Sequence, residues 1–278
     1  MGVMSRRTSA LSAVLVTALA VTLATAARGT DQRGARIVTF TIASPLVHAT
    51  MPIAAVVPAG STTRPRSLLV FLHGKDANQG SYLTDAMFAA LSRLGAQAPD
   101  VVFPYGGADS YWHDRASGAW GSYVIREVIP QALARLHADP RRVAIGGISM
   151  GGFGALDLAR LDPGRFCAAG GHSAALWSAG GESAAGAFDD AQDFARHDVI
   201  AAARTGALSH GIPVWIDVGT LDPFRSADTL LASLLRAHGQ HVQFHVWPGG
   251  HDGAYWESHW SSYLAFYANA LANCRAAG

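Results

Sequence analysis

The alternation of strand-like and helix-like segments constrains this 278-residue chain more than any other feature. Short runs rich in β-branched and apolar residues, typical of strands, occupy 36–43, 53–57, 67–73, 101–104, 142–148, 166–171, 213–218 and 242–247. From the third run on, apolar residues at helical spacing lie between them, at 81–94, 119–137, 151–160, 226–238 and 254–273. Parallel strands need such crossover helices, so we predict an α/β fold with a mostly parallel central sheet of about eight strands. Helices cover both faces, and the first two strands form an antiparallel edge.

Composition and charge narrow the class of protein. Half of the residues are apolar and only 15% are charged, which favours a folded body over disorder. Twenty-one basic and twenty acidic side chains give a net charge of +1, so no basic stripe is available and nucleic acid is not expected as a partner. Because no linker divides the chain, we predict one catalytic domain over residues 28–278.

The N-terminus has the layout of a signal peptide. Arg6-Arg7 precedes an uncharged stretch over 8–27, and Ala24-Thr25-Ala26 supplies small side chains for cleavage. We therefore expect residues 1–27 to be removed and the protein to be secreted or held in the cell envelope, with no stable membrane insertion. The alternative is an uncleaved anchor, which the many Ala, Ser and Thr residues make only weakly apolar.

Two cysteines, Cys167 and Cys274, are present. Export would allow a disulfide between them to persist, whereas Cys167 lies in an apolar run and could equally be a buried free thiol. Neither cysteine has the spacing of a metal site, so the sequence leaves the pairing open.

A Gly-x-Ser-x-Gly motif stands between the strand at 142–148 and the helix at 151–160. Gly147 and Gly151 lie two residues before and two residues after Ser149. A tight strand-to-helix turn requires glycine at such positions, since bulky residues would not fit there. Such a turn presents the hydroxyl above the sheet at a helix N-terminus. The sequence thus predicts Ser149 as a nucleophile, against the alternative of a serine in an ordinary glycine-rich turn.

A serine nucleophile needs a base and an acid that orients the base, in the chain order Ser, Asp or Glu, His. Asp222 lies on the loop after the strand at 213–218, and we predict it as the acid; its alternative role is a turn or helix-cap residue, and Asp217 is its rival within the strand. His251 lies in the turn after the last strand and is the predicted base. His245 lies in a strand and His259 in a helix, so neither has the expected loop position.

The developing negative charge on an attacked carbonyl oxygen needs backbone N–H donors. We assign these to Met150, directly after the nucleophile, and to Lys75 in the loop after 67–72, where His73 is expected to brace the loop. This chemistry requires no metal and no organic cofactor. A metal site at the His113-Asp114 or His251-Asp252 pair is disfavoured because these residues lack a closed ligand set.

Substrate contacts are predicted from the aromatic loop at 105–114, which follows a strand on the expected active-site side. Tyr111 and Trp112 are the candidates for lining an acyl or aryl pocket, although such a loop can equally be a packed lid. The stretch at 174–211 is expected to form a small helical cap.

Together these motifs resemble the esterase D-like group of α/β hydrolases, which includes S-formylglutathione hydrolases, feruloyl and other carbohydrate esterases, and secreted mycolyltransferases. The resemblance rests on the segments 67–75, 147–152, 219–224 and 249–252, and it covers most of the chain after about Arg36. It implies the α/β-hydrolase fold and a triad of Ser149, Asp222 and His251. Gly253 stands where mycolyltransferases carry tryptophan, and the signal peptide argues against a cytosolic substrate such as formylglutathione.

We therefore expect a secreted serine esterase that hydrolyses small-molecule, carbohydrate or lipid esters through an acyl-enzyme. One alternative is an acyltransferase of the mycolyltransferase type that uses the same triad. Another is a non-catalytic cell-wall-binding homologue, against which a complete triad argues.

Overall fold

A computed structural model describes Met1 and residues 32–60, 62–208 and 211–274. The predicted signal peptide, apart from Met1, lies outside the described residues. No helix within the described ranges is both long enough and apolar enough to cross a membrane.

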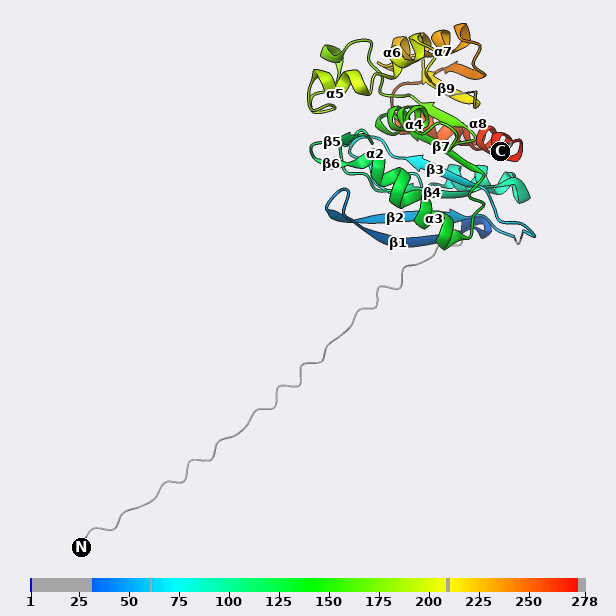
Figure 1. Cartoon of the computed structure of the whole chain (residues 1–278). Coiled ribbons are helices and arrows are strands. Elements are labelled where there is room, and N and C mark those ends of the chain that lie inside the picture. Colours follow the sequence, from blue (N-terminus) through cyan, green and yellow to red (C-terminus); the bar gives the residue numbers. More distant parts are fainter. Residues whose placement is uncertain (2–31, 61, 209–210, 275–278) are drawn as a thin grey trace.

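The described residues build a central sheet of eight strands (Figure 1). Its spatial order is β1 (Arg36–Ser44), β2 (Ala49–Val57), β4 (Asp100–Pro104), β3 (Leu68–Leu72), β7 (Val143–Ile148), β8 (Ala169–His172), β9 (Val214–Gly219) and β10 (Val242–Trp247). β2 is antiparallel to both β1 and β4, and every other neighbouring pair is parallel. This confirms the predicted mostly parallel sheet with an antiparallel edge.

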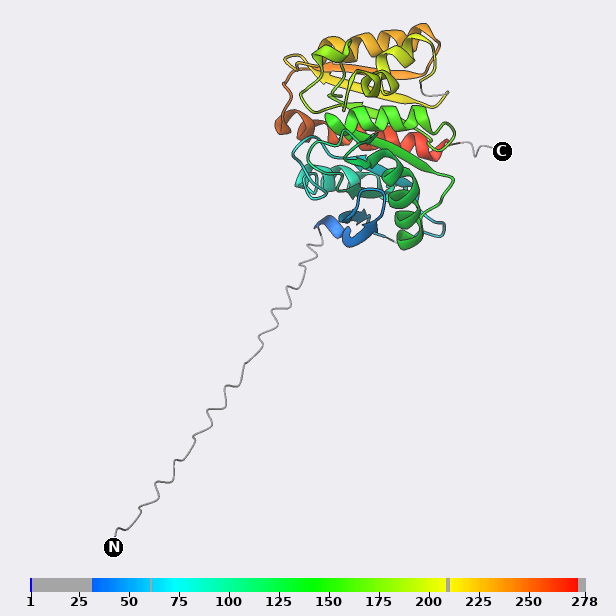
Figure 2. The same cartoon turned by 60° about the vertical axis from the view of Figure 1, so that its left-hand side comes forward.

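Helices cover both faces of the sheet (Figures 1 and 2). One face packs against α3 (Ile129–Leu136), α4 (Met150–Leu161) and α7 (Arg225–Ala237), the other against α1 (Asp85–Arg93) and α8 (Gly253–Ala272). Successive strand side chains point to opposite faces. On β3, Leu68, Val70 and Leu72 therefore join the first core while Leu69 and Phe71 join the second, all fully buried. A strand buried on both faces is continuously apolar, as this one is.

The helix predicted over 119–137 is interrupted. α2 (Trp120–Tyr123) passes into a π-helical turn at Val124–Val128 before α3 begins. Pro130 lies at the start of α3 and has no N–H to donate to the preceding turn, which accounts for a change of hydrogen-bonding pattern there. The spacing of the apolar residues does not reveal this interruption of the α-helix.

The predicted cap at 174–211 is helical in part. It contains a 3₁₀ turn at Gly180–Glu182, α5 (Ala191–Arg196) and α6 (Val199–Arg204). A helical cap was predicted here, but the sequence patterns did not give bounds for α5 or α6, and they missed the short hairpin of β5 (Asp114–Arg115) and β6 (Gly118–Ala119). Each of these elements is shorter than the window over which periodicity can be measured.

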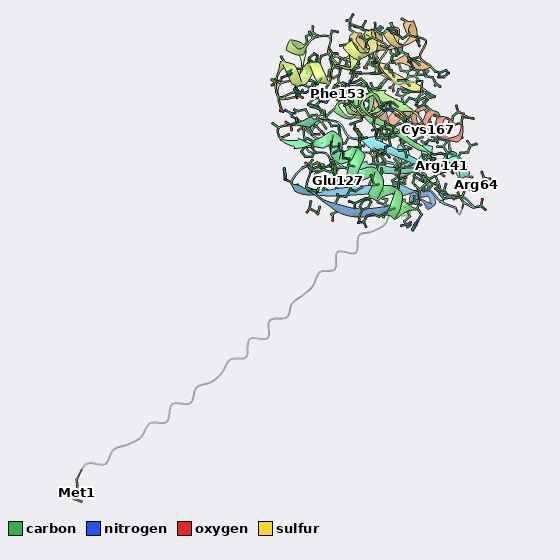
Figure 3. The ribbon with its side chains drawn as sticks, in the orientation of Figure 1. Met1, Arg64, Glu127, Arg141, Phe153 and Cys167 are labelled. Carbon is green, nitrogen blue, oxygen red and sulfur yellow. A yellow bond between two sulfur atoms is a disulfide. The ribbon has the colours of Figure 1, made fainter. Side chains whose placement is uncertain are left out.

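The two ends of the parallel sheet carry different features. Ser149 follows the carboxyl end of β7, whereas Cys167 precedes the amino end of β8. Phe153, on the first turns of α4, and the pair Cys167 and Arg141 accordingly lie toward opposite sides of the molecule (Figure 3). Cys167 and Cys274 form a disulfide with Cα atoms 5.4 Å apart, which resolves the question that the sequence left open.

Candidate active site

Ser149 occupies a strained turn between β7 and α4. Its backbone has φ 57° and ψ −117°, a region that residues with a side chain rarely adopt. The surrounding strand and helix hold it there, and the side chain stands at the amino end of α4.

Glycine is obligatory on both sides of this turn. A Cβ atom built on Gly147 would lie 2.5 Å from the carbonyl oxygen of Gly151, and one on Gly151 would lie 2.1 Å from that of Leu72. These contacts are with backbone, which cannot move aside as a side chain could. The close approach of α4 to β3 and β7 is thus the physical reason for the Gly-x-Ser-x-Gly spacing.

The structure brings Ser149, His251 and Asp222 into one hydrogen-bonded chain. His251 Nε2 lies 2.9 Å from Ser149 Oγ, and His251 Nδ1 lies 2.9 Å from Asp222 Oδ2. Because a carboxylate only accepts, Nδ1–H donates to Asp222 and Nε2 is left to accept the serine proton. The three residues come from the loops after β7, β9 and β10, in the positions that the sequence predicted.

Asp222 is held as an anion. Its side chain is fully buried, and burial alone would raise the pKa of the carboxyl. Hydrogen bonds from His251, the Phe224 amide and the Ser173 hydroxyl outweigh burial and lower the pKa below its usual value. Asp222 is therefore ionised and accepts the Nδ1–H of His251 as a carboxylate.

Asp217, the rival acid, lies in a different network. Its carboxylate accepts from Trp215 Nε1 at 2.7 Å, His172 Nδ1 at 2.6 Å, and the hydroxyls of Tyr255 and Tyr263, each at 2.9 Å. All of its hydrogen-bonding capacity is used inside the core. This network ties β8 and β9 to α8 and makes no contact with His251.

The two predicted oxyanion donors flank Ser149. Lys75 lines the same pocket as Ser149, and Met150 is the first residue of α4. Within the described ranges, neither backbone N–H has an acceptor. A buried N–H such as that of Met150 is costly to leave unpaired, so its freedom suits a group that receives an acceptor only during reaction.

His73 braces the loop that carries Lys75, as expected. Its Nδ1–H donates to Gly74 O at 2.8 Å and its Nε2 accepts from Gly106 N–H at 3.0 Å. Burial lowers the pKa of His73 to about 4, with the Gly74 bond opposing the shift. The imidazole therefore remains neutral and keeps one donor and one acceptor in place.

Around Ser149 lies a pocket of about 540 Å³. Its walls carry the rings of Tyr82, Tyr111, Phe224 and Trp256, and small residues from the cap, Ala175 and Ala184, lie beside them. Of the two predicted substrate contacts, Tyr111 is part of this lining.

The prediction for Trp112 was wrong. Its side chain is fully buried, packs on Gly106 and Gly154, and donates Nε1–H to His73 O at 3.0 Å. Because successive residues of the loop turn in different directions, Tyr111 lines the pocket while Trp112 packs into the core and binds the backbone of His73.

Several residues near the pocket escaped the sequence analysis. Tyr82 accepts the Gly74 N–H at 3.1 Å, Ser173 helps to lower the pKa of Asp222, and the Trp256 ring packs against His251. Asp228, fully buried on α7, has no hydrogen-bond partner for either oxygen among the described residues. Burial, followed by the charges of Asp222 and Asp217, raises its pKa well above the usual value. No motif marked these positions, because their roles depend on contacts between distant segments.

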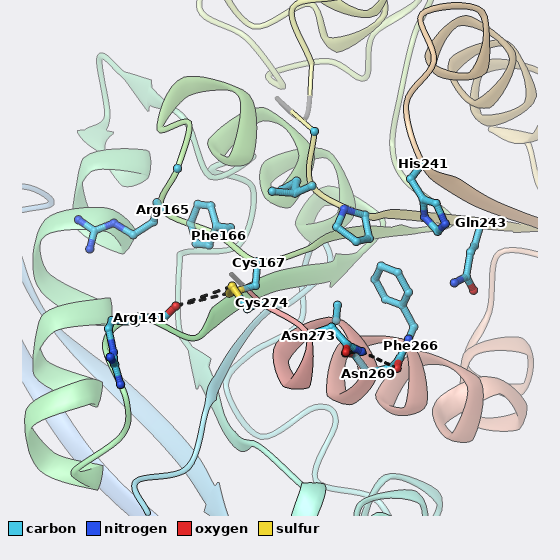
Figure 4. A pocket seen from close by; sticks show the side chains of 15 residues that line it. Arg141, Arg165, Phe166, Cys167, His241, Gln243, Phe266, Asn269, Asn273 and Cys274 are labelled. Carbon is cyan, nitrogen blue, oxygen red and sulfur yellow. Dashed lines mark hydrogen bonds between the residues drawn. A yellow bond between two sulfur atoms is a disulfide. The ribbon is translucent and has the colours of Figure 1, made fainter. Parts of the chain in front are cut away.

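A second pocket of about 400 Å³ lies at the other end of the sheet, beside the disulfide (Figure 4). His241, Gln243, Phe266, Asn269 and Asn273 line one side of it. The lining contains neither a hydroxyl side chain nor a carboxylate, so it does not offer the groups for nucleophilic catalysis. Across the described ranges, no group of three or more His, Cys, Asp or Glu residues is placed to hold a metal.

Comparison with known families identifies the chain. A family model described as "Putative esterase" matches residues 44–267. The chain belongs to this esterase family. It is an esterase-type hydrolase with the α/β-hydrolase fold, and the predicted membership of the esterase D-like group is confirmed. No curated protein matches its sequence significantly.

Solved structures show the same fold in this esterase's relatives. A ferulic acid esterase superposes with a TM-score of 0.74 at 20% identity, over 85% of this chain and 98% of its own. An S-formylglutathione hydrolase from Agrobacterium tumefaciens gives 0.74 at 18% identity, over 86% and 96%. MPT51 (FbpC1) from Mycobacterium tuberculosis gives 0.62 at 21% identity, over 85% and 98%. At such identities the likeness establishes the shared fold.

Proposed function

We propose that this esterase is a secreted serine hydrolase that cleaves carboxylic esters through an acyl-enzyme on Ser149. The observation that carries the proposal is the continuous chain Asp222–His251–Ser149, with 2.9 Å at each hydrogen bond to the imidazole, opening into a pocket. A protein that only binds its ligand would need neither this series of hydrogen bonds nor a strained serine backbone.

In the acylation step, Ser149 Oγ attacks the ester carbonyl carbon while His251 Nε2 takes its proton. The carbonyl π electrons move to oxygen, which the N–H groups of Met150 and Lys75 stabilise. Collapse of this intermediate breaks the bond to the alkoxy oxygen, which leaves as the alcohol after receiving the proton from His251. Asp222 stabilises the imidazolium and fixes its tautomer throughout.

In the second step, His251 accepts a proton from water, whose oxygen attacks the acyl carbon. The second oxyanion collapses, the bond to Ser149 Oγ breaks, and the proton returns to the serine as the acid is released. An acceptor alcohol that replaced water would turn the same cycle into acyl transfer, so the two reactions differ only in what enters the pocket.

The pocket supports an ester with an apolar acyl or aryl group. Tyr82, Tyr111, Phe224 and Trp256 supply aromatic walls, and its volume of about 540 Å³ suits a small molecule or one end of a carbohydrate or lipid ester. The proposal requires no metal and no organic cofactor.

Export is part of the proposal. The charged start, uncharged stretch and small residues of 1–27 have the layout of a cleaved signal, and the disulfide between Cys167 and Cys274 supports an oxidising destination. Mass determination of the protein recovered from outside the producing cell should find a new N-terminus near residue 27. Recovery of the uncleaved chain in the membrane would instead identify an anchor.

The activity is tested with p-nitrophenyl esters of increasing acyl length, with and without glycerol or trehalose as acceptor. Ser149→Ala should reduce kcat at least about 1,000-fold without loss of folding, because it removes one hydroxyl at a partly exposed turn. Ser44→Ala, which removes a buried serine hydroxyl from the edge strand β1, is the matched control and should retain activity. Turnover that persists in Ser149→Ala would refute the assignment, and acylated acceptor as the main product would identify a transferase.

A further inference from the structure

Ser173 occupies an unusual position directly after β8. It is fully buried and has φ 47°, which residues with a side chain rarely adopt. Its N–H donates to Asp217 O at 2.8 Å, so the end of β9 fixes this backbone conformation. Because a buried hydroxyl needs hydrogen-bond partners, the contacts of Ser173 Oγ indicate its role.

The hydroxyl joins two residues of the active site. Ser173 Oγ accepts the Trp256 Nε1–H at 3.1 Å. The hydroxyl also lies close enough to Asp222 to help lower the pKa of that carboxyl. Ser173 thus holds the Trp256 indole in place next to the proposed acid.

Trp256 carries the connection to the base. It lies in the first turns of α8, just after the His251 loop, and its ring meets the imidazole edge to face with centroids 5.1 Å apart and planes at 87°. Phe224 packs against the imidazole in a similar manner, with centroids 5.2 Å apart. The imidazole is thus held by two rings, one of which is anchored through Ser173.

We propose that Ser173 is a positioning residue that orients His251 by anchoring the Trp256 ring against it. The inference rests on the proposed function, since it assigns Ser173 a role only if Ser149, His251 and Asp222 form the catalytic triad. Ser173 contacts neither substrate nor the reacting atoms. It links three loops, those after β8, β9 and β10, at the point where the orientation of His251 is decided.

The expected effect is on kcat rather than on binding. Ser173→Ala leaves the Trp256 N–H without its acceptor and so releases the ring that packs against His251. We expect kcat to fall about tenfold, the usual effect of leaving one buried donor unpaired, while KM changes little. The pH profile of kcat should also change, because the Ser173 hydroxyl helps to lower the pKa of the Asp222 carboxyl that pairs with His251.

Two companion variants separate the hydroxyl from the fold. Ser173→Gly also lacks the hydroxyl but accepts the positive φ without strain, so it should match Ser173→Ala in kcat while being more stable. Ser44→Ala, at another buried serine, should leave both kcat and the pH profile unchanged. A kcat that recovers in Ser173→Gly would show a purely conformational effect and would overturn the proposal.

A double-mutant cycle with Trp256→Phe tests the connection between the two residues. Phenylalanine keeps a ring beside His251 but has no N–H, so we expect it to lower kcat by severalfold and Ser173→Ala to add little further loss in its presence. Fully additive losses would show that hydroxyl and indole act separately, contrary to the proposal. If wild-type protein lacks Ser149-dependent ester turnover, the proposed function fails first; if it has that turnover and Ser173→Ala equals wild type, only the positioning role fails.

Discussion

At the scale of single residues, the site depends on groups whose backbone conformation or protonation state in the fold differs from the one favoured in water. Ser149 is kept at positive φ, His73 is kept neutral, and Asp222 is kept charged despite burial. Each state costs free energy that the surrounding fold supplies.

The neutral state of His73 gives stability a defined pH dependence. Its pKa is about 4 in the fold and near 6.5 in the unfolded chain, so between these values the unfolded state binds the proton preferentially. Stability from this group is complete above pH 6.5 and falls by about 3 kcal/mol as the pH drops to 4. Urea unfolding at a series of pH values should give a shallower acid slope for His73→Gln than for wild type. His241→Gln, at an exposed histidine, should keep the wild-type slope; equal slopes for all three proteins would contradict the account.

Gly151 should tolerate no side chain. In Gly151→Ala the new Cβ meets the Leu72 carbonyl oxygen, which belongs to the central strand β3, so we expect at least about 3 kcal/mol of lost stability together with loss of activity. Thermal unfolding and ester turnover measure the two effects. Gly181→Ala is the matched control, because a Cβ there has no atom within 4 Å and the residue is not part of the pocket lining. A stable and active Gly151→Ala protein would mean that α4 does not lie against β3 as described.

At the scale of elements, the cap is attached by buried carboxylates. Asp193 on α5 is fully buried and accepts from His113 Nε2 at 3.0 Å, Arg196 Nη2 at 3.1 Å and the Asp189 N–H at 2.9 Å. His197, just after α5, lies 2.7 Å from Asp157 Oδ2 on α4. Since Ala175 and Ala184 of the cap segment line the pocket, these pairs hold one of its walls.

Asp193→Asn should loosen this wall. The loss of a buried charge that accepts from several donors should cost about 2–3 kcal/mol and make the segment 177–208 easier to cleave by proteases in the native state. Limited proteolysis with mass mapping reads this out. Asp85→Asn, at an exposed residue of α1, should leave the cleavage rate unchanged. An unchanged rate in Asp193→Asn would mean that the cap is held by its apolar contacts alone.

The elements also show how far a sequence reading extends. The strand at 242–247 was predicted with its observed bounds, and long apolar-periodic helices such as α7 and α8 were placed within a residue or so, because their patterns span several turns. β2 begins at Ala49, four residues before the predicted 53, since edge pairing with β1 extends a strand beyond its apolar core. Trp112 was misassigned because the direction of a loop side chain depends on backbone angles that no residue pattern fixes.

At the scale of the whole molecule, the candidate active site and the disulfide lie at opposite ends of the parallel sheet. The proposed triad residues lie beyond strand carboxyl ends, where loops of an α/β sheet converge, and this is why the motif, the loop positions and the chain order were enough to select them. The disulfide between Cys167 and Cys274 lies at the opposite end and closes a separation of 107 residues. Ser173, Trp256 and Asp228 could not be predicted, since their contacts arise only once the sheet brings β8, β9, α7 and α8 together.

The disulfide should stabilise the fold without serving the reaction. Closure of so long a loop is worth about 4–5 kcal/mol on the chain-entropy model, so Cys167→Ser with Cys274→Ser should lower Tm markedly while kcat at 25 °C stays near wild type. Reduction of the wild-type disulfide should lower Tm to a similar extent and have no effect on the double variant. A Tm that does not respond to reduction would show that the bond does not contribute to stability.

The central claim is that Ser149 is the nucleophile, and covalent labelling with a fluorophosphonate tests it most directly. Intact mass and peptide mapping should find one adduct per chain, on Ser149, with none in Ser149→Ala, slow labelling in His251→Ala, and none in unfolded wild type, because reactivity depends on the assembled triad. An adduct on a different residue, or ester turnover by a protein that is never labelled, would contradict the account.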